Sequence, residues 1–418
     1  MKYQVSVIIP NYNGLKFMSM CMPALAAQTF SDFEIIVVDN GSTDGSADYL
    51  KKLEQDGLAR TAASSALAAV SRARAAAKAA EGEAPLAQNS IAAHIMHAKD
   101  TCSIVTDEDE TKASAHVEHA SCSGSAADCI PLRAILLSEN TGFSGAVNAG
   151  IAAADCDYVL LLNNDTEADP RFIERLVFAM EQSRSAAYAP PIFAISPKMV
   201  QYYNRALLDD AGDGYNLLGW AYQRGVGQQT ELPQFNCRRE IFSACAGASL
   251  YNRALLEDIR LSDGIYFDPM HFAYLEDIDV SFRARTQGYA VYYEPTAVVY
   301  HVGSGTSGSR YNSFKVRLAA RNNVYLNYKN MPLLQLLLNL PGILIGVLIK
   351  YLFFMKKGFG RDYAAGFKEG LRDMRKCRKT PFLLSNILFY VEIEVLMVAD
   401  TISYVRDFFA RRFANMHK

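Results

Sequence analysis

The order of hydrophobic and polar residues in the first part of the chain predicts alternating strands and helices. Val5 to Ile9 is a short, largely β-branched run that Pro10 ends, which is typical of a buried strand. A helical stretch follows from Leu15 to about Gln28, then a strand from Phe33 to Asp39 and a helix near Ala47 to Gln55. Strands that alternate with helices in this way form right-handed units around a parallel sheet.

The same alternation returns after residue 132 and becomes mixed beyond residue 190. The expected elements are a strand at 133–138, a helix through Asn148 and Ile151, a strand at 157–162, a helix from Asp169-Pro170, a strand at 247–251, a helix at 276–287 and final strands at 290–293 and 297–300. The strand at 157–162 is the most hydrophobic of the sheet and ends at Asn163-Asn164-Asp165-Thr166. Open α/β sheets bind ligands at the carboxyl ends of their strands, so functional residues are expected at this edge.

Residues 57–131 interrupt the pattern and form a predicted insertion. Residues 59–80 contain 12 alanines and no acidic residue, with few large hydrophobic side chains that could pack on the sheet, so an exposed helical or flexible segment is expected. The insertion also holds a group of possible zinc ligands: His94, His97, Cys102, His116, His119, Cys122 and Cys129. Their spacing matches no standard zinc finger, and we favour incidental ligands in a flexible segment over a zinc site.

Composition places the chain among ordinary globular proteins. It has 418 residues, 50% hydrophobic and 21% charged, with a mean hydropathy of zero, which excludes a disordered chain, collagen and a small disulfide scaffold. The formal net charge of −2 gives no reason to expect a nucleic-acid partner. The eight cysteines have no regular spacing and indicate reduced thiols in a cytosolic chain.

Two aspartates follow strands at the expected ligand edge. Asp39 ends a strand and precedes the turn Asn40 to Ser46, so its carboxylate could accept hydrogen bonds from a ribose or a base. Asp165 ends the run after Leu162, where a phosphate-bound Mg²⁺ or Mn²⁺ would find a carboxylate ligand. Either residue, taken alone, is at least as compatible with an ordinary helix cap or turn.

Three carboxylates, Glu276, Asp277 and Asp279, begin the helix predicted at 276–287. They could simply complement the helix dipole, or one of them could be a general base that accepts a proton from an attacking hydroxyl group. His301 follows the last strand beside Gly303-Ser304-Gly305-Thr306. A single histidine in such a place is more often packed or exposed than a ligand.

The order of these motifs resembles the family 2 glycosyltransferases, and most closely their rhamnosyltransferase-like branch. The resemblance covers residues 1–56 and 132–330. It rests on Val7 to Asn13, Ile36 to Ser46, Glu139 to Ser144, Leu162 to Thr166, Glu276 to Asp279, Tyr300-His301 and Arg321-Asn322. It implies a GT-A fold, which is α/β and Rossmann-like with a mostly parallel sheet flanked by helices. It also implies inverting, metal-dependent transfer of a sugar from a nucleotide-sugar donor, with Mg²⁺ or Mn²⁺ as the cofactor.

The resemblance also assigns roles to individual residues. The nucleotide sugar would be bound by Pro10, Tyr12, Asp39, Ser42, Asn140 and Asn164. Asp165 falls on the last acid of the metal motif, whereas Asn163 stands at the usual first acid, so metal binding would depend on Asp165 and His301. Asp277 falls on the catalytic base, with Glu276 as its neighbour or acceptor-site partner.

The C-terminal part, residues 331–418, combines hydrophobic and basic segments. Residues 331–349 contain no charged residue, but Gln335, Asn339 and Pro341 weaken a membrane span of borderline length. Residues 350–380 hold ten Lys or Arg and three acids, a net charge of +7, which suits an anionic cytoplasmic leaflet. The run at 382–409 has an amphipathic pattern. We expect a helical region at the cytoplasmic face of a membrane, either peripheral or with one span, rather than a helical subdomain packed on the catalytic domain.

These observations predict three parts: a GT-A catalytic domain at 1–56 and 132–330, the insertion at 57–131 and the C-terminal helical region at 331–418. The expected acceptor is a cell-surface glycan or lipid-linked glycan, and the donor a dTDP- or UDP-sugar, with dTDP-rhamnose first through the resemblance. A nucleotidyltransferase that makes sugar nucleotides and a non-catalytic sugar-binding scaffold are the alternatives. The first should have a basic, Gly-rich loop after strand one, where this chain has Asn11 to Gly14. The second need not retain Asp39, Asp165, Asp277 and His301 together.

Overall fold

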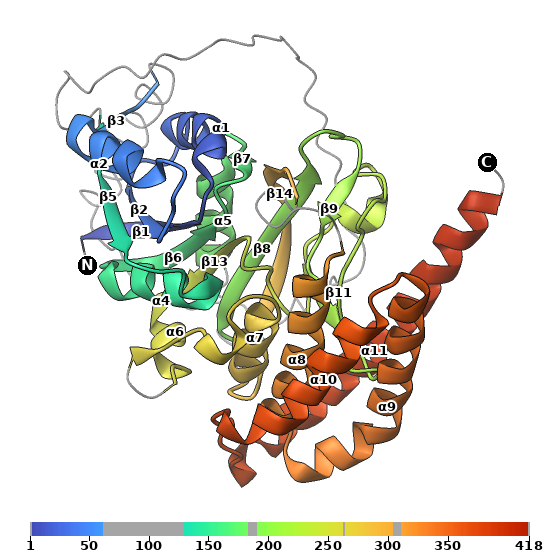
Figure 1. Ribbon diagram of the computed structural model, residues 1–418. Coiled ribbons are helices and arrows are strands. Elements are labelled where there is room, and N and C mark those ends of the chain that lie inside the picture. The colour runs from blue at the N-terminus through green and yellow to red at the C-terminus, as the bar shows by residue number, and fades with distance from the viewer. Residues whose placement is uncertain (1, 62–128, 183–189, 262–263, 304–310, 417–418) are drawn as a thin grey trace, which may run out of the picture.

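The computed structural model describes residues 2–61, 129–182, 190–261, 264–303 and 311–416, with side chains described up to residue 409. Within these ranges the chain forms one large mixed sheet with helices on both faces and a group of helices at its C-terminal end (Figure 1). The predicted α/β class with a mostly parallel, helix-flanked sheet is confirmed. The insertion, apart from its ends, lies outside the described residues.

The main strands follow the spatial order β12-β14-β8-β13-β6-β1-β2-β5. Their bounds are β1 Tyr3–Asn11, β2 Phe33–Asn40, β5 Leu132–Leu137, β6 Cys156–Leu162, β8 Ile192–Gln201, β12 Arg239–Glu240, β13 Ala248–Asn252 and β14 Ala290–His301. The strands β5, β2, β1, β6, β8 and β14 point the same way, whereas β13 and β12 run antiparallel to their neighbours. Two short strands, β7 (Thr166–Ala168) and β9 (Leu208–Asp210), pair with β14 and β8.

Helices cover both faces of the sheet because the central strands are hydrophobic on both sides. Val5, Val7 and Ile9 of β1 pack with α1 (Leu15–Ala26), α2 (Ser46–Asp56) and α5 (Phe172–Gln182). Ile8 of the same strand packs on the opposite face with α4 (Gly142–Ala153), α6 (Arg253–Asp258) and α7 (Glu276–Arg285). Residues that alternate between two covered faces produce the uninterrupted hydrophobic runs seen in the sequence.

The last part of the sheet differs from the prediction. The residues expected as two final strands form one strand, β14, whose pairing with β8 shifts between Glu294 and Val298. Pro295 lies inside this shift and has no N–H to donate to a neighbouring strand. One continuous strand therefore carries His301 to the same sheet edge as the ends of β1 and β6.

Four helices at the C-terminal end lie together on one side of the sheet (Figure 1). They are α8 (Ser313–Asn330), which precedes the C-terminal region, and α9 (Leu333–Lys356), α10 (Gly360–Asp373) and α11 (Ile387–Met416) within it. A hydrophobic cluster joins α8, α9 and α11 to the rest of the protein through Phe282 of α7, Leu326 of α8, Ile343 of α9 and Ile393 of α11. A smaller cluster packs Tyr363 of α10 against α8. The helix α9 continues through Pro341.

Two minor pairs of strands complete the structure. β10 (Asp213–Tyr215) pairs with β11 (Ala221–Gln223). At the two ends of the insertion, β3 (Leu58–Ala59) pairs antiparallel with β4 (Cys129–Ile130). The chain thus leaves and re-enters the described structure at adjacent positions.

Candidate active site

Polar residues converge where β1, β2, β6 and β14 end. A cavity of about 1240 Å³ lies at this edge of the sheet. Among the residues predicted from the sequence, those that line it are Pro10, Tyr12, Asn140, Asn164, Asp165, Glu276, Asp277 and His301. The sheet topology therefore brings together side chains that are separated by up to about three hundred residues, which matches the rule that open α/β sheets place ligands at strand ends.

Asp39 and Ser42 do not line the cavity, but both accept hydrogen bonds from Asn11, which does. Asp39 is only 2% exposed. Its Oδ1 accepts a hydrogen bond of 2.7 Å from Asn11 Nδ2, and its Oδ2 accepts one of 3.1 Å from the Ser42 N–H. Asn11 Oδ1 in turn accepts a hydrogen bond of 2.6 Å from Asn164 Nδ2. Sequence reasoning missed Asn11, although its position directly after the buried strand was the available signal.

A second amide pair joins the end of β2 to the loop before α4. Asn40 Nδ2 donates to Asn140 Oδ1 at 3.0 Å, and Asn40 Oδ1 accepts from the Thr141 N–H at 2.9 Å. Gly142 then begins α4 with a φ of +78°, and a Cβ at this position would lie 2.4 Å from the Phe272 carbonyl oxygen. Glycine is required here because any side chain would collide with the loop that leads to Asp277.

His301 lies between two carboxylates. Its Nε2 is 3.3 Å from Asp165 Oδ1, and its Nδ1 is 2.7 Å from Asp209 Oδ2. Burial lowers the pKa of His301, but the hydrogen bonds and charges of Asp165 and Asp209 more than offset this effect and raise the pKa to about 10. Asp209 was missed by sequence reasoning because nothing in its local sequence links it to a histidine 92 residues away.

Asp277 lies in the first turn of α7, at the wall of the same cavity. Its Oδ1 accepts a hydrogen bond of 2.8 Å from the Ile278 N–H, and its Oδ2 accepts one of 3.4 Å from the Ala246 N–H. Burial raises the pKa of Asp277, and these hydrogen bonds limit the rise. Glu276 is 6% exposed, and its pKa is also raised by burial and by the charge of Asp277. Both carboxyl groups therefore take up protons more readily than free ones.

The loop before α7 has a strained backbone. Phe272, Tyr274 and Leu275 have φ values of +63°, +70° and +68°, a left-handed conformation that is unfavourable for residues other than glycine. The buried Asn322 of α8 holds this loop, because its Nδ2 lies 2.8 Å from each of the carbonyl oxygens of His271, Ala273 and Tyr274. Arg321–Asn322, one of the motifs of the resemblance, thus acts on the backbone next to Asp277.

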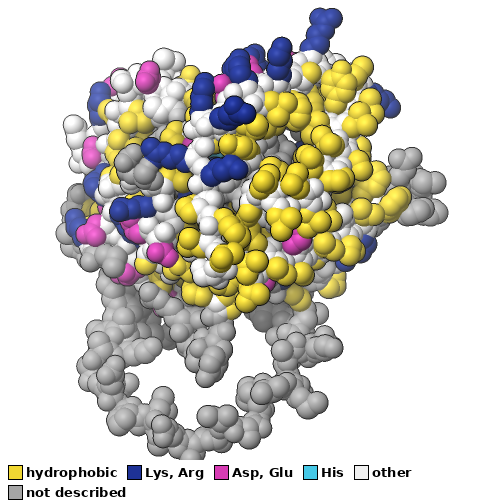
Figure 2. All heavy atoms as spheres, turned by 90° about the horizontal axis from the view of Figure 1, so that it is seen from below, with side chains coloured by type: hydrophobic (Ala, Val, Ile, Leu, Met, Phe, Trp, Pro, Cys, Tyr) yellow, Lys and Arg dark blue, Asp and Glu magenta, His cyan; other side chains and the backbone are white. Residues whose placement is uncertain are grey.

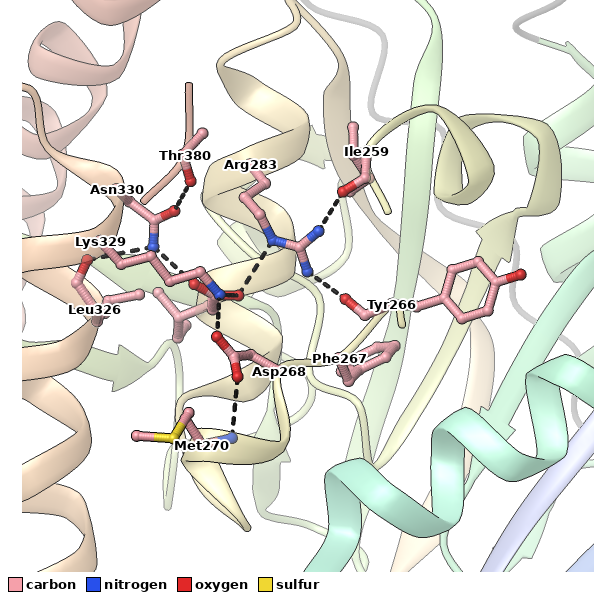
Figure 3. Close-up of polar contacts among 12 residues, drawn as sticks. Ile259, Tyr266, Phe267, Asp268, Met270, Arg283, Leu326, Lys329, Asn330 and Thr380 are labelled. Atoms are coloured by element: carbon pink, nitrogen blue, oxygen red, sulfur yellow. Dashed lines mark hydrogen bonds and ion pairs between the residues drawn. The ribbon is translucent and has the colours of Figure 1, made fainter. Parts of the chain in front are cut away.

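A buried network of charged groups fixes α7 against α8 (Figure 3). Lys329 of α8 is fully buried, and its Nζ lies 2.6 Å from Asp268 Oδ2 and 2.9 Å from Asp279 Oδ2. Arg283 Nε donates to the same Asp279 oxygen at 3.2 Å, and Asn330 Nδ2 donates to Asp279 Oδ1 at 2.8 Å. Asp279, expected from the sequence only as one of three acids at a helix start, is thus a structural anchor one turn or less from Asp277.

Two buried carboxyl groups and a thiol form a further cluster beside the cavity. The ligand atoms of Asp210, Asp213 and Cys245 lie within 4.8 Å of one another. Burial and the charge of Asp209 raise the pKa of Asp210 to about 8, and burial also raises the pKa values of Asp213 and Cys245. The three ligand atoms are close enough to hold a metal ion, so the cluster is a second candidate for a cation site.

Most of the possible zinc ligands of the insertion, His94 to Cys122, lie outside the described residues, so that interpretation stays untested. Cys129 is described and is disulfide-bonded. The expectation that the thiols are reduced is therefore wrong for Cys129, which in this state offers no thiolate to a metal.

Short stretches of the chain are similar to curated glycosyltransferases. Over 52 residues, 12% of this chain and 16% of the relative, it is 46% identical to the uncharacterized glycosyltransferase alr2836 of Nostoc sp.. Over 50 residues, 12% of this chain and 16% of the relative, it is 44% identical to glycosyltransferase AglE of Haloferax volcanii. The matches thus span less than a fifth of the length of either relative.

Solved structures of low sequence identity match most of the chain. Residues 1–349 of TarS from S. aureus, solved with UDP-GlcNAc, share 13% identity with a TM-score of 0.42, over 91% of this chain and 94% of that one. The mannosyltransferase PcManGT from Pyrobaculum calidifontis, solved with GDP-Man and Mn²⁺, shares 12% identity with a TM-score of 0.43, over 89% and 88%.

The sequence pattern of a known family covers more than half of this chain. That family is Glycosyl transferase family 2, and its pattern matches residues 6–84 and 89–260. The matched residues include the ends of β1, β2 and β6 and the loop that carries Asp165. The chain therefore belongs to glycosyl transferase family 2.

Proposed function

We propose that this protein is an inverting glycosyltransferase that moves a sugar from a nucleotide-sugar donor to a hydroxyl group of a glycan. One observation carries the proposal: Asp277, with its raised pKa, shares a single cavity with the Asp165–His301 pair and with the polar ends of β1 and β6. In this proposal Asp277 is the general base, the Asp165–His301 pair is the cation site and the strand ends are the nucleotide site, all around one cavity.

The donor nucleotide is assigned to the ends of β1, β2 and β6. Tyr12, whose side chain is partly exposed, and Pro10 line the cavity, and the hydrogen-bonded series of Asp39, Asn11 and Asn164 lies beside them. A buried carboxylate that polarises an amide can position that amide for a base or ribose hydroxyl. In this assignment Asp39 and Ser42 act through Asn11. The donor is a dTDP- or UDP-sugar, and dTDP-rhamnose is the first to test.

Asp165 and His301 fit a divalent cation. Two ligands on an octahedral ion with bonds of about 2.1 Å lie about 3 Å apart, and Asp165 Oδ1 and His301 Nε2 are 3.3 Å apart. A carboxylate on the other ring nitrogen, as Asp209 provides, is the usual partner of a metal-binding imidazole. Mg²⁺ or Mn²⁺ held here would offset the negative charge of the departing diphosphate.

Asp277 is assigned as the base of a single displacement. The acceptor oxygen attacks the anomeric carbon, the bond from that carbon to the donor phosphate oxygen breaks, and the hydroxyl proton passes to Asp277. The configuration inverts because one attack occurs and no protein nucleophile takes part. Glu276 lines the same cavity, and its Oε2 has no hydrogen-bond partner among the described residues, so it is assigned to an acceptor hydroxyl.

The acceptor is assigned as a cell-surface glycan or a lipid-linked glycan, with the enzyme at the cytoplasmic face of a membrane. Among the described residues one helix, Leu333–Lys356, is long and hydrophobic enough to cross a membrane by length and composition. The basic segment that follows it supports a location beside an anionic leaflet.

A donor panel tests the proposed reaction. Nucleotide release from dTDP-rhamnose, UDP-sugars and GDP-sugars is measured with Mg²⁺, Mn²⁺ or a chelator, for the native chain and for Asp277→Asn. The matched control is Asp48→Asn, whose side chain is 87% exposed on α2. Release that needs a divalent cation and Asp277, but not Asp48, supports the proposal. Formation of a sugar nucleotide with release of pyrophosphate would instead identify a nucleotidyltransferase.

A further inference from the structure

Two C-terminal helices carry hydrophobic stripes that face outward. Exposed hydrophobic residues recur every three or four positions, which places each set on one side of its helix. In α9 the stripe consists of Leu334, Leu337, Leu338, Leu344, Ile345, Leu348, Leu352 and Met355. In α11 it consists of Leu388, Val391, Val395, Val398, Ile402, Val405 and Phe409. We call the two stripes together the apolar face.

The two stripes belong to helices that lie side by side. Gln335 Nε2 and Asn339 Nδ2 of α9 both donate to Glu394 Oε2 of α11 at 3.0 Å. Farther along both helices, Trp220 lies between them: its ring is 5.8 Å from the Tyr404 ring of α11 and 5.3 Å from Lys350 Nζ of α9. The helices therefore run in the same direction. Figure 2 shows hydrophobic side chains gathered on one face of the molecule, over these C-terminal helices.

Basic side chains lie along one border of this hydrophobic area (Figure 2). Lys356, Lys357 and Arg361, at the turn between α9 and α10, are all exposed. Residues 350–380 as a whole carry a net charge of +7, whereas the complete chain has −2. Solvent-exposed hydrophobic side chains next to concentrated positive charge complement the acyl chains and headgroups of an anionic lipid surface.

We propose that the apolar face inserts into one leaflet of an anionic phospholipid bilayer, with α9 and α11 lying in the plane of the membrane. This deepens the membrane location named in the proposed function by assigning the surface and the mode of binding. The membrane-binding proposal depends on the proposed function only for its role in the cell. Vesicle binding itself can be measured whether or not the protein transfers a sugar.

The packing of α9 favours a helix that lies on the membrane over one that crosses it. Its opposite side is fixed to the protein from Gln335 to Gly346 by the buried residues Gln335, Asn339, Ile343 and Gly346. A Cβ at Gly342 would lie 2.5 Å from the Leu217 carbonyl oxygen, and one at Gly346 would lie 2.1 Å from that of Leu218. The helix backbone thus contacts a loop of the catalytic part directly, which closes this side of α9 to lipid. A spanning helix would need a hydrophobic or protein-covered environment on every side.

Vesicle co-sedimentation of the full chain tests the surface. The probes are vesicles of phosphatidylcholine alone and of phosphatidylcholine with phosphatidylglycerol. The double variant Leu344→Glu with Leu348→Glu places charges at two positions that are 55% and 56% exposed. It should lower the bound-to-free ratio by at least roughly a hundredfold, because two side chains that enter the acyl region become charged. The matched control is Phe178→Glu on α5, 62% exposed and outside the face, which should bind like the native chain.

A second variant tests the basic border. Lys356→Gln, Lys357→Gln and Arg361→Gln together should lower binding to phosphatidylglycerol vesicles by roughly tenfold to a hundredfold, and should change binding to phosphatidylcholine little. Circular dichroism and thermal unfolding of each variant establish that it is folded.

Four results would overturn the proposal. The native chain could fail to bind either vesicle, or the Leu344/Leu348 variant could bind as well as the Phe178 control. Gel filtration could also show that the native chain is a dimer that this variant converts to a monomer, with no vesicle binding, which would assign the apolar face to a second copy. Retention in native membranes after extraction with alkali, without binding of the purified chain to preformed vesicles, would show that α9 spans instead.

Discussion

Replacing Lys329 with methionine should destabilise the protein strongly. The ammonium group is fully buried between Asp268 and Asp279, and its removal leaves both carboxylates without their shared partner. Methionine keeps most of the aliphatic volume, so the loss is mainly electrostatic. Breaking a buried ion pair by removing one member costs about 3–5 kcal/mol, which is a large part of the roughly 5–15 kcal/mol that holds a domain folded.

The partners that remain after the substitution show which carboxylate carries most of this cost. Asp279 retains Arg283 and Asn330 as partners after the substitution, whereas Asp268 retains the hydrogen bond of 3.0 Å from the Met270 N–H. The cost should therefore fall mainly on Asp268, and Asp268→Asn combined with Lys329→Met should cost less than the sum of the single substitutions.

Urea unfolding at neutral pH, followed by fluorescence and circular dichroism, measures the effect. Lys51→Met is the matched control, because Lys51 pairs with Asp48 at 3.3 Å on an exposed surface where both side chains are more than half exposed. Such a pair contributes about 0–1 kcal/mol. If Lys329→Met destabilises no more than Lys51→Met, the network does not anchor α7 as inferred.

The same network has a pH signature. Burial opposes ionisation of Asp279, but the charges of Lys329 and Arg283 more than offset it and lower its pKa below the ordinary value of 3.8. A carboxyl group whose folded-state pKa is lowered stabilises the protein above its unfolded-state pKa, and this contribution is lost as the pH falls toward the folded-state value. The native chain should therefore lose this contribution only in strongly acidic solution, whereas Lys329→Met should lack part of it at neutral pH.

Three further predictions concern the cavity. Asp277→Asn should lower the transfer rate by roughly 10²–10⁴-fold with donor affinity retained, measured by steady-state kinetics and calorimetry; a near-native rate would remove Asp277 as the base. Because burial raises the pKa of Asp277 and the base works only when ionised, the rate should rise with pH through a value above 3.8, and a pH–rate profile that stays flat down to that value would contradict this. Asp165→Asn and His301→Gln should each weaken Mn²⁺ binding by about tenfold or more, and calorimetric titration showing native affinity in both would exclude them as ligands.

The strands and helices could be predicted from the sequence where they depend on the local pattern of hydrophobic and polar residues. The runs at 5–9 and 157–162 are hydrophobic on both faces, and they became the central strands β1 and β6. The last two predicted strands are one strand, β14, because a shift in its pairing with β8 around Pro295 keeps the strand continuous. The spacing of hydrophobic residues in the sequence does not reveal such a shift.

The candidate site could be anticipated in part. Asp165, Asp277 and His301 stand beside strand or helix ends, and the structure places all three at one cavity. Asn11 could have been noted from its place directly after a buried strand, but its contacts with Asp39 and Asn164 could not be anticipated. Asp209 gave no such signal, because its role depends on contact with His301, which is distant in sequence. Such contacts exist only after the sheet has formed.

The pairing of β3 with β4 has a consequence for how this protein can vary. Ala59 and Cys129 are register partners, so the two ends of the insertion lie next to each other in space. The entropic cost of closing a loop between two such points grows only slowly with its length. Segments of very different length can therefore connect these two ends at little extra cost in loop-closure entropy, which makes the junction a suitable place for length variation in evolution and in protein engineering.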